Sequence, residues 1–357
     1  MKKKRNRTLV AEVFAVALLA WVVTNAGVVP QLTATASPAE SAADYFKGKT
    51  IELAYCGSPG GGYHLWSRLI GKYLEKYTGA NVVAITKNAA GGAEGIHYTY
   101  TIKGKGFFTI CLSRGPSQVF TEAMGFPGLD IRWDSRKFNY IGRITQDVNA
   151  FHLTPKKFKN IDDLRAAQEV KIGTDSPFGS VNMHSTMYLE GLGLKNAKVI
   201  LGYRGSRGRA LATMQGEIDG CSGSYDSNVR YYEAGQLLPF CVLAKERYEK
   251  APDVPTIWEL GVAKEAEKWI RWSEAIDAVG RVILAPPDAP KDRVEFLQNV
   301  LAKIAADADF LADVKKAKIT VQYLPAVETK KLVLEAVQLS PEEAQELKHI
   351  FSKKWIK

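Results

Sequence analysis

A repeated order of strand, glycine-rich loop and helix runs along the chain and limits what it can fold into. Residues 50–55 are typical of a buried strand, residues 56–62 supply Gly and Pro, and residues 63–77 place apolar side chains at helical spacing. Residues 81–86 and 107–112 indicate two more strands with a helical stretch between them. Such alternation predicts an α/β fold with a mainly parallel sheet covered by helices on both faces.

The same order restarts in the second half of the chain. Asn160 can cap a helix that starts at Ile161, and a further helix is expected over residues 181–192. Short strands are expected at residues 150–153, 170–173, 199–201, 218–221 and 240–243. A strand at residues 281–285 leads through Pro286 and Pro287 into a helical C-terminal third, which has too few strands for a third α/β domain and is expected to cover the first unit.

The length of the chain agrees with two α/β units. A single hydrophobic core stops growing near about 250–300 residues, and this chain has 357. We expect a first lobe at residues 37–148 plus 281–357 and a second lobe at residues 149–280. Residues 1–36 are set apart as a targeting segment.

The N-terminus has the order of features of a secretory signal. Five cations between Lys2 and Arg7 precede an apolar run at residues 13–23, and Ala34-Thr35-Ala36 is an A-x-A site. We predict cleavage after Ala36 and a periplasmic location. The alternative is an uncleaved anchor over residues 9–29, which Glu12 and Asn25 interrupt. Cleavage would lower the net charge from +10 to +6.

Composition excludes several classes of protein. Apolar residues make up 46% and charged residues 24%, which fits a soluble globular body. The Lys and Arg residues are scattered and not interleaved with aromatic residues, so we expect no nucleic-acid partner. An exported chain could form two disulfides, but all four cysteines lie in or at the end of apolar runs, which favours buried thiols: Cys56, Cys111, Cys221 and Cys241.

Three loops have the composition of an anion-binding site. In parallel α/β sheets, ligands lie at the carboxyl ends of strands, where helix N-termini offer free backbone N–H groups. Residues 57–62 open the first helix, and their missing side chains let a carboxylate approach the backbone. Residues 88–92 open the second helix, and residues 176–180 open a helix of the second unit, where Ser180 could cap the helix and donate its hydroxyl to a ligand.

Motifs for catalysis and for cofactors are lacking. Gly57 and Gly62 are spaced as in a phosphate-binding loop, but Tyr63 and His64 replace the Lys and Ser or Thr that hold phosphate and magnesium. The sequence contains no G-x-S-x-G motif, no H-E-x-x-H motif and no dinucleotide-binding G-x-G-x-x-G in this loop. We therefore expect a non-catalytic binding site with no cofactor and no metal.

Five segments in order resemble one known family. They are residues 49–63, 88–92, 202–206, 216–220 and 252–256, and together they are similar to the Bug family, the substrate-binding proteins of tripartite tricarboxylate transporters. The resemblance implies a two-lobed type II periplasmic-binding-protein fold whose first two loops bind a ligand carboxylate through backbone N–H groups and water. The ligand-binding residues that it implies are Ser58, Gly60, Gly61, Gly62, Tyr63, Asn88, Gly91, Gly92, Ser176, Gly179 and Ser180, with Tyr203 and Arg204 as further candidates.

The resemblance also implies a function. The chain would capture a small carboxylate and deliver it to the membrane subunits of a tripartite tricarboxylate-type transporter. His64 stands where many relatives carry Asp, and Ala90, Ala93 and Glu94 replace the Pro and Gly that are usual in the second loop, so the class of carboxylate is open. Arg204 or Arg207 could pair with a second carboxylate. The alternatives are a binding module that signals to a membrane sensor and a secreted α/β hydrolase with Ser58 or Ser180 as nucleophile.

Overall fold

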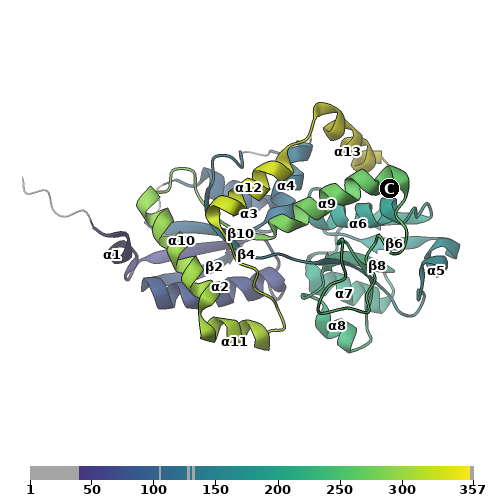
Figure 1. Cartoon of the computed structure of the whole chain (residues 1–357), viewed down its shortest axis with the longest axis horizontal. Coiled ribbons are helices and arrows are strands. Elements are labelled where there is room, and N and C mark those ends of the chain that lie inside the picture. The colour runs from purple at the N-terminus through teal and green to yellow at the C-terminus, as the bar shows by residue number, and fades with distance from the viewer. Residues whose placement is uncertain (1–39, 104–105, 127–128, 131–132, 354–357) are drawn as a thin grey trace, which may run out of the picture. The chain divides into compact units, whose positions relative to one another are not determined.

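The computed structural model describes residues 40–103, 106–126, 129–130 and 133–353 (Figure 1). The predicted signal peptide and its cleavage site lie outside these residues. Within the described ranges, no helix combines the length and the apolar character that a membrane span requires.

The first of two sheets has six strands in the order β11-β4-β10-β3-β1-β2. Four of its ranges agree closely with the predicted strands, whereas β4 and β11 lie in segments where no strand was predicted. The strands are β1 (Thr50–Tyr55), β2 (Asn81–Thr86), β3 (Phe108–Arg114), β4 (Asn139–Thr145), β10 (Arg281–Ala285) and β11 (Leu324–Pro325).

The second sheet has five strands in the order β7-β6-β8-β5-β9. Each overlaps a predicted strand, and its ends differ from the predicted ends by at most three residues. They are β5 (Asn149–Leu153), β6 (Val170–Gly173), β7 (Ala197–Ile200), β8 (Gly220–Ser224) and β9 (Leu238–Val242). Both sheets belong to one compact unit that begins at Ser41.

Each sheet is mixed, with an antiparallel strand between strands of the opposite direction. In the first sheet β10 pairs antiparallel with both β3 and β4, so β1, β2, β3 and β4 share one direction. In the second sheet β5 pairs antiparallel with β8 and β9, so β6, β7, β8 and β9 share one direction. The mainly parallel character is therefore confirmed for strand direction. The inserted strands are those that follow a passage from the other sheet, because β5 comes after β4 and β10 comes after β9.

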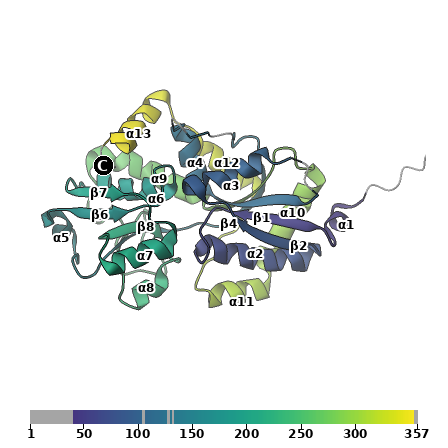
Figure 2. The same cartoon turned by 180° about the vertical axis from the view of Figure 1, so that it is seen from behind.

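Helices cover both faces of the two sheets (Figures 1 and 2). Around the first sheet lie α1 (Ala42–Phe46), α2 (Gly62–Thr78), η1 (Ala89–Gly92), α3 (Ala93–Thr101), α4 (Gly115–Met124), α10 (Lys291–Ala306), α11 (Ala308–Lys316) and α12 (Ala326–Val337). Around the second lie α5 (Ile161–Ala166), α6 (Ser180–Gly191), α7 (Gly205–Gln215), α8 (Val229–Glu233), η2 (Lys264–Ala266) and α9 (Glu267–Val279). The last helix, α13 (Pro341–Lys353), contacts α4 and α6.

The strands build two main cores because successive side chains point to opposite faces of a sheet. Ile51 and Leu53 of β1 pack with Trp66 of α2 and Leu297 of α10. Side chains on the other face of the first sheet join a core that continues through α4, α6 and α9 into the second sheet. We refer to the part built on each sheet as a lobe.

Local sequence sets where the helices begin. Asn160 accepts from the backbone of Asp162 and Asp163, and Asp163 accepts from the Asn160 N–H, so the predicted cap is a complete capping box. In contrast, α2, α6 and α7 start without a side-chain cap. Their first N–H groups are left for other partners, and all three helices begin at the cavity described next.

Candidate functional site

A cavity of about 80 Å³ lies between the two lobes. Its wall from the first lobe comes from the β1–α2 loop, the end of β3 and the start of β10. Its wall from the second lobe comes from the starts of α6 and α7, the end of β8 and the end of α9. The cavity is therefore at the strand ends where α/β folds bind ligands.

Uncapped helix openings reach the cavity from both lobes. Gly61 is the N-cap of α2 and Gly179 that of α6, and as glycines they have no side chain that could accept a hydrogen bond from the first N–H groups of the helix. Gly205 and Ser206, the first residues of α7, line the cavity as well. A helix N-terminus carries partial positive charge, so these openings favour an anion.

The lobes touch through backbone and small side chains. A Cβ added to Gly91 would lie 2.4 Å from Gly179 Cα, so glycine is required for this approach. Ser117 of α4 accepts a hydrogen bond from the Ser180 N–H at 2.9 Å and donates to the Ser180 hydroxyl at 3.1 Å. The cavity is closed on this side by direct contact between the lobes.

The first predicted loop contributes most of its candidates to the cavity. Ser58, Gly61, Gly62 and Tyr63 line it. Gly60 does not, because its N–H donates to His64 Nδ1 at 3.0 Å on the exposed side of the loop. His64 therefore holds the loop from outside.

The second predicted loop supports the first instead of lining the cavity. Asn88 Nδ2 donates to Ser58 Oγ at 3.2 Å, and Asn88 Oδ1 accepts from Arg114 Nη2 at 3.4 Å. Gly91 packs on Gly179, and Gly92 lies close to Cys56. Asn88 therefore positions Ser58 and Arg114.

In the second lobe, only some of the predicted ligand-binding residues line the cavity. Ser180 lines the cavity, whereas Ser176 accepts from the Phe178 N–H at 3.2 Å within its own loop. Tyr203 and Arg204 lie outside the wall, and Arg204 is exposed. Their neighbours Gly205, Ser206 and Arg209 form the wall in their place.

Two arginines that the sequence analysis did not single out share one carboxylate across the lobes. Arg114 ends β3 of the first lobe, and its Nη1 lies 3.4 Å from Asp175 Oδ2 of the second lobe. Arg209 of α7 places its Nη1 3.9 Å from the same oxygen. Arg114 and Arg209 are 9% and 4% exposed. Two buried guanidinium groups with one shared carboxylate leave an excess of one positive charge in this ion-pair cluster.

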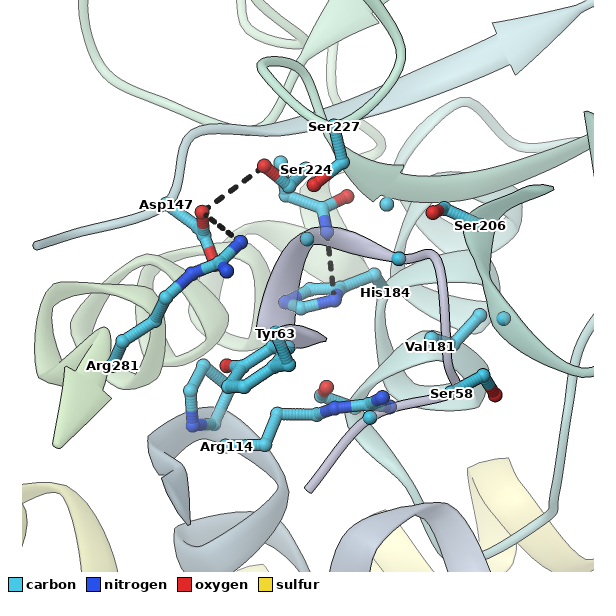
Figure 3. A pocket seen from close by; sticks show the side chains of 18 of the residues that line it. Ser58, Tyr63, Arg114, Asp147, Val181, His184, Ser206, Ser224, Ser227 and Arg281 are labelled. Carbon is cyan, nitrogen blue, oxygen red and sulfur yellow. Dashed lines mark hydrogen bonds and ion pairs between the residues drawn. The ribbon is translucent and has the colours of Figure 1, made fainter. Parts of the chain in front are cut away.

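A third arginine is neutralised by its own partner. Arg281, which begins β10, donates to Asp147 from both Nε and Nη2 at 2.9 Å, and Ser224 donates to Asp147 at 3.0 Å. The Tyr63 ring lies between guanidinium groups, 4.3 Å from that of Arg281 and 5.4 Å from that of Arg114 (Figure 3). Burial raises the pKa of Tyr63, so its hydroxyl stays protonated.

A histidine and two acceptors form another part of the wall. Asn149 Nδ2 donates to His184 Nδ1 at 2.9 Å, and His184 Nε2 donates to Asp277 Oδ1 at 2.6 Å. Burial raises the pKa of Asp277, and the neighbouring His184 opposes this shift.

Unpartnered polar atoms concentrate in this cavity wall. Buried atoms without a hydrogen-bond partner include Arg114 Nε, Asn149 Oδ1, Arg209 Nε, Asp277 Oδ2 and Arg281 Nη1, and all five residues line the cavity. Buried polar groups are normally paired, so the wall is built for a polar occupant. Among the described residues, no three His, Cys, Asp or Glu side chains are grouped in a way that could hold a metal ion.

Part of this charged wall has a signal in the sequence. Arg281 opens a predicted strand, and Arg114 follows the predicted third strand, where the carboxyl end of a parallel strand faces the ligand. Asp147, Asp277 and His184 have no comparable signal, because only the passages between lobes bring them to the cavity.

Comparison with known proteins gives one curated relative and several solved structures. The UPF0065 protein in the TAR-I ttuE-ttuC' intergenic region of Agrobacterium vitis is 24% identical over 284 residues, which is 77% of each chain. The periplasmic binding protein BugD superposes with a TM-score of 0.67 at 19% identity, covering 85% of this chain and 97% of its own. MatC from Rhodopseudomonas palustris with bound malate superposes with a TM-score of 0.65 at 15% identity, covering 85% and 99%. No family model matches the chain.

The fold and the interlobe cavity define the class: this is a two-lobed periplasmic-binding-protein fold. The similarity to the UPF0065 protein and to the fold of BugD agrees with the resemblance of the ordered sequence motifs to the Bug family.

Proposed function

We propose that the chain is an extracytoplasmic receptor that captures a small carboxylate between its lobes and delivers it to a tripartite tricarboxylate-type membrane transporter. The observation that carries this proposal is the convergence of uncapped helix openings and buried guanidinium groups on one interlobe cavity. Both kinds of group bind carboxylates through N–H donors. The malate in the similarly folded MatC supports the ligand class.

The binding mechanism follows from contacts between the lobes. Residues 37–148 plus 281–357 would move against residues 149–280 by bending of the connecting segments, as in other hinge-closing binding proteins. The ligand carboxylate would stabilise the closed form by binding both Arg114 and Arg209, which belong to opposite lobes. The closed form would be the state that the membrane subunits recognise.

The location and the lack of catalysis belong to the same proposal. Export by residues 1–36 to the periplasm agrees with the periplasmic binding proteins that share the fold. The hydrogen bonds give no support to a hydrolase, because His184 contacts Asn149 and Asp277 while the Ser180 hydroxyl contacts Ser117. A sensor partner in place of a transporter is the remaining alternative.

Two measurements test the proposal. Calorimetry against mono-, di- and tricarboxylates between about pH 5 and pH 8 should show one site per chain for at least one acid. Uptake of that acid by cells should then fall when the gene is deleted. Lack of binding by every acid would reject the ligand class, and binding without any effect on uptake would favour the sensor.

A further inference from the structure

The geometry points to a ligand that is a small carboxylate carrying its own hydrogen-bond donor, a hydroxyl or an ammonium group, beside the carboxylate. This inference rests on the proposed function and specifies its substrate class. It comes from the separation of unpartnered donors and unpartnered acceptors in the wall of one small cavity.

The donor side is the cluster of Arg114, Asp175 and Arg209. Its excess positive charge and the free Nε atoms of both arginines are matched by one carboxylate, whereas the unpartnered Asp175 Oδ1 belongs to a residue that does not line the cavity. Arg281 adds a free Nη1, but its charge is already balanced by Asp147. This side of the cavity therefore offers unbalanced positive charge for one ligand carboxylate.

The acceptor side is the group of Asn149, His184 and Asp277. His184 uses both ring nitrogens on its two neighbours, which leaves Asn149 Oδ1 and Asp277 Oδ2 as buried acceptors without a donor. Leaving a buried acceptor without a donor is unfavourable, so a ligand that supplies a donor here gains affinity over one that does not. A second carboxylate at this place would meet acceptors and the charge of Asp277 instead.

The volume of the cavity limits the size of the ligand. A cavity of roughly 150 Å³ holds benzene, which has about six non-hydrogen atoms. The cavity here has about 80 Å³. Lactate and alanine have as many non-hydrogen atoms as benzene, so a three-carbon acid already takes up this cavity, and a larger acid would extend into the neighbouring hollow that shares Gly61, Gly62 and Arg281 with it.

A matched series of acids tests the inference on the unaltered protein. Calorimetry at pH 7 would compare propionate, lactate, alanine and succinate, since the first three differ mainly in the group beside the carboxylate. We expect lactate or alanine to bind at least tenfold more tightly than propionate and succinate. Tighter lactate identifies the donor as a hydroxyl, and tighter alanine identifies it as an ammonium group.

A variant then locates the acceptor. In Asp277→Asn the advantage of the better of lactate and alanine over propionate should fall to within threefold, and in Arg165→Met, which changes an exposed residue of α5, it should persist. Propionate or succinate binding as tightly as lactate and alanine would overturn the inference. If none of the four acids bound while a larger carboxylate did, the inference would fail and the proposed function would stand. If no carboxylate bound at all, the proposed function itself would fail.

Discussion

Arg114 Nη1 and Asp175 Oδ2 lie 3.4 Å apart, and the two residues belong to different lobes. The pair is largely buried, and Arg209 approaches the same carboxylate oxygen from α7. The same ion pair therefore holds the lobes together and sets the charge of the site. An anion that binds between the two arginines would stabilise the closed form.

Replacing Arg114 tests this link. Arg114→Met removes the charge and the contact with Asp175, and we expect affinity for the best carboxylate to fall by at least about thirtyfold, close to 2 kcal/mol. Arg165→Met removes the same charge from an exposed position on α5 and should change affinity by less than threefold. Calorimetry on both variants measures the difference. Equal losses would show that only the overall charge of the protein matters.

Gly179→Ala tests closure without altering charge. The new Cβ would lie 2.8 Å from Gly91 Cα, so the lobes must separate to accept it. We expect about a tenfold loss of affinity with little change in the melting temperature of the ligand-free protein. Gly208→Ala is the control, since no atom lies within 4 Å of its added Cβ. An unchanged affinity in Gly179→Ala would mean that the two loops do not approach in the bound state.

Burial of His152 should make the free energy of unfolding depend on pH. Burial, with a smaller contribution from the charge of Arg209, lowers its pKa from 6.5 to about 3. The unfolded chain therefore binds this proton at higher pH than the folded protein does. Its contribution to the free energy of unfolding is complete above pH 6.5, declines by up to about 1.4 kcal/mol per pH unit as pH falls, and is gone below about pH 3.

His152→Gln should reduce this slope. Urea unfolding at pH 7, 5 and 4 would compare the wild type with this variant and with His349→Gln, in which an exposed histidine of α13 is replaced. We expect a smaller loss of stability between pH 7 and pH 4 in His152→Gln and an unchanged loss in His349→Gln. The same slope in all three proteins would contradict a buried neutral His152.

Local pattern predicted most strands because their apolar runs are continuous and end at Gly or Pro. Residues 50–55 and 170–173 match β1 and β6 in full. β4 was not predicted, because its run is short and polar residues interrupt it. The antiparallel insertion of β5 and β10 was also missed, since alternation along the chain carries no information about which strand pairs with which.

Some residues of the site could also be predicted from the sequence, and others could not. The glycine-rich first loop was predictable because a helix opening needs no distant partner, and four of its candidates line the cavity. The charged wall was predictable only in part, because Asp147, His184 and Asp277 reach the cavity only through the passages between the lobes. Asn88 was singled out as a ligand contact, whereas its hydrogen bonds run to Ser58 and Arg114.

Hydrogen exchange with and without the tightest-binding carboxylate tests the central claim most directly, because it reports on both lobes at once. A ligand held between the lobes should slow exchange in the openings of α2 and α6 together, around Gly62 and around Val181. Slower exchange in only one opening, or only in the neighbouring hollow lined by Lys316, Lys318 and Thr320, would contradict an interlobe site.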